Sequence, residues 1–275
     1  MELTFWGVRG GIPIPGRSTV GIGGDTVCLD ITDSDCDGNA TCRAVLDAGT
    51  GITHLGRSLL SGPAGKGAGD IHIFLTHTHW DHIQGFPYFI PAFIPGNRVT
   101  FWGRAVSERS VSDLLEGQMR AVYNPIFALK NMGSTITVNE IDSAPVTFGP
   151  FTMKTMLLPH KGAPSLGFRI SDGKHDIAFL GDLEYVDNSI PTEIAEFTAG
   201  TDLLIHDAGE LDLSTIDSHL ALQLAESTGI KRLLFTHFAP WHTDRDVARL
   251  IGAMRKRASS DIEIEAANQG LRVIV

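Results

Sequence analysis

Short apolar runs alternate with glycine-containing turns along the first half of the chain. The runs are rich in β-branched and aromatic residues, which favours strands over helices. The same pattern returns later in the chain. We predict strands over residues 2–8, 26–31, 44–49, 71–77, 98–103, 137–141, 151–160, 166–171, 176–182, 203–209 and 232–238.

Three segments show the spacing of helices instead. Residues 110–123 open with serines that would serve as N-caps, and residues 218–229 end in a glycine. The third predicted helix covers residues 244–258. Strand-rich halves that are each followed by helices suggest an α/β fold of two packed sheets with helices outside. The length fits a single domain over residues 1–275.

Composition and charge narrow the class of protein. Hydrophobic residues make up 43% of the chain and charged residues 20%, as in a globular protein. The net charge of -10 opposes the phosphate attraction that nucleic-acid binders use, so stable nucleic-acid binding is not expected. The N-terminus, MELTFWGVRGG, fits neither a signal peptide nor a membrane helix. The three cysteines fit a reducing cytosol, so we expect a cytoplasmic protein with no membrane partner.

Residues 74–86, FLTHTHWDHIQGF, concentrate candidate metal ligands behind a predicted strand. His77, His79, Asp81 and His82 would project from a loop at the carboxyl end of that strand, where scaffolds often present functional groups. Imidazole and carboxylate groups at this spacing are metal ligands. Four candidate ligands are more than one tetrahedral ion with an open position would take from a single loop. The sequence therefore suggests two neighbouring ions.

Three later strands end in the same way. His160, Asp182 and His237 each close an apolar strand and precede a loop. Because a carboxylate has two oxygens, Asp182 is the predicted bridge between two cations. Zinc suits the imidazole-rich set, while manganese would tolerate the carboxylates.

The order of these motifs resembles a known family. THTHWDH has the H-x-H-x-D-H form of the metallo-β-lactamase fold superfamily, and PHKGAPSLGFRI, LGDLEY, LLIHDAG and KRLLFTHF resemble its later motifs. LTFWGVRGGIP, VLDAGTGI and GFPYFIPAFIPGNRVTFWG resemble its phosphodiesterase branch, which includes ribonuclease Z and small bacterial cyclic-nucleotide phosphodiesterases. The resemblance covers nearly the whole chain. It implies a four-layer αββα sandwich, a dinuclear site and a homodimer.

The resemblance also assigns the ligands and the reaction. One ion would take His77, His79 and His160, the other Asp81, His82 and His237, with Asp182 between them. Two divalent ions ~3.5–4 Å apart would lower the pKa of a bridging water and leave hydroxide poised for in-line attack on a phosphodiester. The expected function is hydrolysis of small phosphodiesters such as cyclic nucleotides.

Three other functions stay open. A tRNA 3′-processing endonuclease would use the same chemistry, but the acidic charge and the lack of a Gly- and Lys/Arg-rich inserted arm oppose it. A lactone or thioester hydrolase is a second alternative, because a fold does not fix its substrate. A metal-binding sensor without turnover would have no physical need for the complete ligand set.

A proton donor for the leaving group is expected after residue 203. LLIHDAG followed by DSHLALQLAESTG resembles an arrangement of the ribonuclease Z branch in which an acid orients a histidine at the start of a helix. The resemblance implies that Asp207 orients His219. It also implies that both residues, together with Asp81, are catalytic. This chain departs from the family pattern, because Leu220 follows the histidine where relatives have serine or threonine. The alternative is that His219 is a solvated histidine at the start of the helix. His242 would then be the next candidate for the proton donor.

A base-binding pocket would need aromatic walls. Arg9 and several aromatic residues could supply them, although aromatic residues near glycine turns more often pack a core. The aromatic candidates are Trp6, Phe86, Tyr88, Phe89 and Tyr123.

Overall fold

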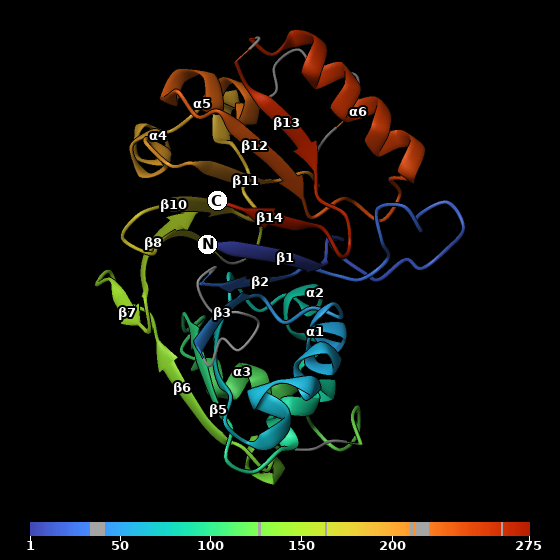
Figure 1. Cartoon of the computed structure of the whole chain (residues 1–275), viewed down its shortest axis with the longest axis vertical. Helices are drawn as coiled ribbons and strands as arrows, with labels where there is room; N and C mark the ends of the chain where they lie inside the picture. The colour runs from blue at the N-terminus through green and yellow to red at the C-terminus, as the bar shows by residue number, and fades with distance from the viewer. Residues whose placement is uncertain (34–41, 126–127, 163, 210–211, 213–219, 260) are drawn as a thin grey trace. The chain divides into compact units, whose positions relative to one another are not determined.

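The computed structural model describes residues 1–33, 42–125, 128–162, 164–209, 212, 220–259 and 261–275. The chain divides into two compact units, each with its own seven-stranded sheet (Figure 1). The prediction of one domain over residues 1–275 stays a prediction. Unit 1 comprises Met1–Gly7, Asp25–Asp142 and Gly270–Ile274, and unit 2 comprises Val8–Gly24, Ser143–Gln269 and Val275.

The sheet of unit 1 is mixed, with strand order β14-β1-β2-β3-β4-β5-β6. Strands β3 to β6 pair in parallel, so the carboxyl ends of β3 and β4 lie at the same edge of the sheet. The strands are β1 (Glu2–Gly7), β2 (Cys28–Thr32), β3 (Cys42–Leu46), β4 (Asp70–Phe74), β5 (Arg98–Gly103), β6 (Thr135–Glu140) and β14 (Arg272–Ile274).

Alternate residues of the central strands bury one face of this sheet under helices. Ile71 and Ile73 of β4 share a hydrophobic core with Val99 and Phe101 of β5, as the two-residue repeat of a strand requires. Side chains from all three helices of the unit join this core. These helices are α1 (Ile52–Ser58), α2 (Trp80–Ile83) and α3 (Val111–Gln118).

The sheet of unit 2 has the order β13-β12-β11-β10-β9-β8-β7. Strands β10 to β13 are parallel, and β8 runs in the direction of β10 because both are antiparallel to β9. The carboxyl ends of β8, β10, β11 and β12 therefore share one edge. The strands are β7 (Val146–Phe148), β8 (Phe151–Leu158), β9 (Ser165–Ser171), β10 (Asp176–Leu180), β11 (Leu203–Asp207), β12 (Arg232–Thr236) and β13 (Glu263–Ala266).

The helices of unit 2 cover one face of its sheet. Ile194, Leu224 and Leu250 from three helices pack with Leu204 and Leu233 of the sheet in one core. Figure 1 shows the longest of these helices running beside β13. The helices are α4 (Thr192–Thr198), α5 (Leu220–Thr228) and α6 (Asp244–Arg257).

Every predicted strand is present, with ends shifted by a few residues. The helix predicted over 110–123 ends at Gln118, and the helix predicted from residue 218 is described from Leu220. The sequence pattern missed α1, α2, α4, β7, β13 and β14 because each is too short to establish a period. None of the described helices has the length and apolarity needed to cross a membrane.

Candidate metal centre

The loop after β4 carries the predicted ligands of unit 1. The side chains of His77, Asp81 and His82 are buried, whereas that of His79 is exposed. The ring of His77 lies 4.3 Å from that of His79 and 4.2 Å from that of His82, measured between centroids. Nε2 of His82 lies 3.3 Å from Oδ2 of Asp81. The four predicted ligands thus form one group within this unit.

A buried carboxylate behind this loop fixes the imidazoles. Asp47 is fully buried in a left-handed conformation (φ 62°) directly after β3. It accepts hydrogen bonds from the backbone N–H of Thr76 (2.8 Å) and from Nδ1 of His82 (2.9 Å). Because the Nδ1 proton of His82 points at Asp47, Nε2 keeps the lone pair that a metal ion needs.

Thr76 extends this support to a second ligand. Its hydroxyl lies 3.0 Å from Oδ2 of Asp47 and 3.0 Å from Nδ1 of His77. A hydroxyl that donates to the carboxylate can accept the Nδ1 proton of His77, which leaves the lone pair of Nε2 for a metal ion. The sequence interpretation assigned no role to Asp47 or Thr76. The signal was present in VLDAG, where an acid closes a strand in the way that Asp182 does.

In unit 2, Asp182 presents its two carboxylate oxygens to two different imidazoles. Oδ2 lies 3.5 Å from Nε2 of His160, and Oδ1 lies 3.1 Å from Nε2 of His237. This is the arrangement that the predicted bridging role requires. Both Asp182 (φ 41°) and His237 (φ 60°) have the strained left-handed backbone that often marks functional sites.

The donor atoms fit a metal ion. Ligand atoms ~2.0–2.2 Å from a tetrahedral zinc ion lie roughly 3.3–3.6 Å from one another. The pairs His82–Asp81 (3.3 Å) and His160–Asp182 (3.5 Å) have this spacing and exceed the ~2.7–3.2 Å of ordinary N–H···O hydrogen bonds. Nitrogen and carboxylate donors are also the types that divalent metals take.

His237 is held from two sides within unit 2. Its Nδ1 lies 3.0 Å from Oδ1 of Asp207, which also accepts the backbone N–H of Gly209 (2.7 Å). The segment around Gly10 passes so close that an added Cβ would lie 2.4 Å from the ring, so only glycine fits there. Asp207 therefore orients the predicted ligand His237. Its predicted partner His219 lies outside the described residues, and the pairing of the two stays a prediction.

Removing the Asp207 carboxylate tests which histidine it serves. Asp207→Ala should weaken zinc affinity ~10- to 100-fold, the usual cost of losing a carboxylate that orients a ligand histidine. Competition with a chelator at fixed pH measures this change. If Asp207 acted only through His219, zinc affinity would stay at the wild-type value while turnover of esters with poor leaving groups fell.

His206 joins Asp207 to the half-buried Tyr185. Burial lowers the pKa of His206, and burial together with the charge of Asp207 raises the pKa of Tyr185, so both side chains are neutral. Nδ1 of His206 donates to the backbone carbonyl of Asp207 (2.8 Å), and the Tyr185 hydroxyl lies 2.9 Å from Nε2. His206 thus supports the strand end on which Asp207 lies.

A second group of ligand types, Cys42, Asp70 and His72, lies on β3 and β4. Trp102 donates its indole N–H to Nδ1 of His72 (3.0 Å), so in the neutral ring Nε2 must carry the proton. Nε2 faces Asp70 at 3.6 Å, and Arg98 pairs with the same carboxylate at 2.8 Å. The hydrogen bond from Trp102 uses the lone pair of Nδ1, so the neutral ring of His72 has none left for a metal.

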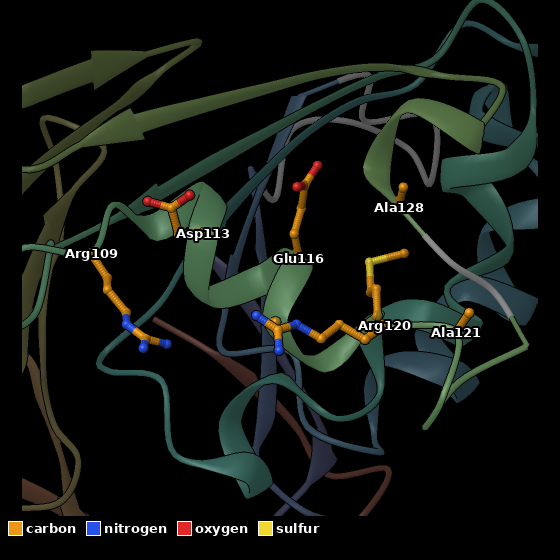
Figure 2. Close-up of a pocket in the computed structure, with 8 residues that line it drawn as sticks. Arg109, Asp113, Glu116, Arg120, Ala121 and Ala128 are labelled. Carbon is orange, nitrogen blue, oxygen red and sulfur yellow. The ribbon is translucent and has the colours of Figure 1, made fainter.

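A surface hollow of about 510 Å³ lies beside α3 and contains none of the predicted site residues (Figure 2). Arg109 and Arg120 line it together with Asp113 and Glu116, so its charges balance. Asp113 also closes a capping box with Ser110 at the start of α3. Asp113, one of the acidic residues that line the hollow, thus has a structural role at the start of α3.

Comparisons with known proteins agree with this arrangement. Residues 43–238 match the family model described as the beta-lactamase superfamily domain. Ribonuclease Z of Staphylococcus carnosus is 26% identical over an alignment that covers 90% of this chain and 91% of the relative. Because the family model spans well over half of the chain, the protein belongs to the metallo-β-lactamase superfamily and is a metal-dependent hydrolase with a His/Asp metal site.

Solved structures confirm the fold. The metallo-beta-lactamase fold protein YhfI from Bacillus subtilis superposes with a TM-score of 0.67 at 18% identity, covering 99% of both chains. A diphosphatase from the PhnP family gives a TM-score of 0.68 at 17% identity, covering 100% of this chain and 97% of the other. The predicted metallo-β-lactamase fold is thus confirmed.

Proposed function

We propose that the protein is a phosphodiesterase that uses two divalent ions. The observation that carries this proposal is Asp182, whose two oxygens face His160 and His237 as a bridging carboxylate would. The proposed ligands are those expected from the sequence: His77, His79, Asp81, His82, His160, Asp182 and His237.

The ions would supply Lewis-acid contacts to phosphoryl oxygens and a water of lowered pKa. The chain's own part is to fix the donors. Asp47 and Thr76 hold the imidazoles of His82 and His77, and Asp207 holds that of His237. Because these supporting contacts set the ring nitrogens before any metal arrives, little reorganisation accompanies metal binding.

We propose a small phosphodiester, such as a cyclic nucleotide, as the substrate. The charge of -10 repels long polyanions more strongly than a single phosphodiester. The similarity to a diphosphatase supports chemistry at a phosphoryl group. The similarity to ribonuclease Z favours precursor tRNA as the rival substrate.

A comparison of two substrates decides between these functions. At matched ionic strength, kcat/KM for 2′,3′- or 3′,5′-cyclic AMP should exceed kcat/KM for precursor tRNA, because the acidic surface penalises the longer polyanion. Faster cleavage of tRNA would reverse the ranking. Hydrolysis of a lactone with neither phosphodiester cleaved would replace the proposed function.

Three further expectations belong to the same proposal. We propose zinc as the preferred metal because histidines dominate the donor set, with manganese as the alternative. The expectation of a homodimer rests on the family resemblance, and the expectation of a cytoplasmic location rests on the composition.

The metal content of zinc-replete protein should approach two equivalents per chain, as metal analysis would measure.

A further inference from the structure

Trp80 is an exposed tryptophan within the ligand motif. The chain has 4 tryptophans. Trp6 and Trp102 are partly buried, whereas Trp80 is 64% exposed. An exposed indole presents a large flat apolar surface to water, which a planar ligand can cover.

The position of Trp80 in the chain places this surface next to the proposed ligands. Trp80 lies between the proposed ligands His79 and Asp81, and consecutive Cα atoms are only ~3.8 Å apart. His79 is exposed as well, whereas Asp81, His82 and Ile83 are buried. The solvent-facing end of the ligand group is therefore the end that carries the indole.

The backbone of Trp80 is fixed. It begins α2, and its carbonyl accepts the backbone N–H of Gln84 at 2.8 Å. An exposed indole offers a flat apolar face, and every nucleobase has a π-face that stacks on such a surface whatever its hydrogen-bonding pattern. A substrate phosphate near His79 would place the rest of the molecule within reach of this face.

We propose that Trp80 binds the planar base of a nucleoside phosphodiester by stacking, and so makes the enzyme prefer nucleotide esters over simple alkyl esters. This inference rests on the proposed phosphodiesterase function and names its substrate class. Unit 2 shows a related feature, since Trp241 is 75% exposed and follows the ligand His237 by four residues.

Two esters with one leaving group isolate the base. Thymidine 5′-(p-nitrophenyl phosphate) and methyl p-nitrophenyl phosphate both release p-nitrophenolate, so their chemical steps are alike and only the group that would stack differs. In the zinc-loaded enzyme, Trp80→Ala should lower kcat/KM for the thymidine ester roughly 5- to 100-fold. The value for the methyl ester should stay within about twofold of wild type. Trp80→Phe should restore most of the loss.

Binding gives a readout that is independent of turnover. Thymidine 5′-monophosphate should quench the tryptophan fluorescence of the wild-type protein, and Trp80→Phe should remove most of that quenching. Phe93→Ala is the matched control. Phe93 is another exposed aromatic residue of unit 1 (36%), and neither of its neighbours is a proposed ligand.

The outcomes separate the two claims. An equal loss on both esters in Trp80→Ala, or no loss on either, would overturn the stacking role while leaving the phosphodiesterase proposal intact. A wild-type enzyme that hydrolysed neither ester when zinc-replete would overturn the proposed function, and this inference with it. A loss of base preference in Phe93→Ala equal to that in Trp80→Ala would also count against Trp80.

Discussion

Asp182→Asn should lose one of the two proposed metal ions and more than ~10²-fold in kcat/KM for a cyclic nucleotide. The amide keeps one oxygen that can ligate but replaces the other with an NH₂ group, which has no lone pair for a metal. Since removing a residue that merely orients a ligand already costs ~10–100-fold, the loss of a bridging ligand should cost more. Metal analysis after gel filtration and initial rates at saturating zinc measure the two effects.

Asp187→Asn is the matched control. Asp187 also has a left-handed backbone (φ 55°), and its side chain is exposed, so the same change of residue type meets a similar backbone without the ligand role. Asparagine tolerates this conformation as aspartate does, which removes backbone strain as an explanation. Full metal content and full activity in Asp182→Asn would show that Asp182 does not bridge two ions.

The candidate ligands could be predicted from the sequence because each of them follows the end of a predicted strand. An apolar run followed at once by His160, Asp182 or His237 is a local pattern, and parallel pairing of strands then brings the ends to one edge. The supporting residues were not predictable in this way. Thr76 is an ordinary residue in sequence, and its role depends on a contact with Asp47 that lies 29 positions earlier in the chain.

The role of His206 likewise depends on a tertiary contact. Tyr185 reaches it from another loop, and its hydroxyl lies 2.9 Å from Nε2 of His206. Among the aromatic candidates, the preferred core role is confirmed for Phe86 and Phe89, which are fully buried, and is wrong for Tyr88 and Tyr123, which are exposed. Arg9 is buried too.

Arg9 illustrates why burial could not be read from its residue type. Its guanidinium donates to the backbone carbonyls of Gly23 and His242, both at 2.7 Å, and so ties two loops of unit 2 together. Burial lowers the pKa of Arg9. Composition and periodicity rarely predict that a charged side chain is buried, because only tertiary contacts supply its hydrogen-bond acceptors.

Loss of the proposed general acid should depend on the leaving group. His219→Ala should slow hydrolysis of a cyclic nucleotide ~10²- to 10⁴-fold, the usual contribution of a positioned proton donor, because the leaving alkoxide is strongly basic. The same variant should keep most of its activity on bis(p-nitrophenyl) phosphate, since nitrophenolate leaves without a proton. Initial rates on both substrates at equal metal content make the comparison.

A ligand variant supplies the contrast. His79→Ala should lose activity on both substrates, because it damages the metal site that both reactions share. An equal loss on both substrates in His219→Ala, at wild-type metal content, would assign His219 to substrate positioning. No loss on either would mean that the departure at Leu220, where relatives have serine or threonine, marks a changed donor. His242→Ala would then be the variant in which the leaving-group dependence should appear.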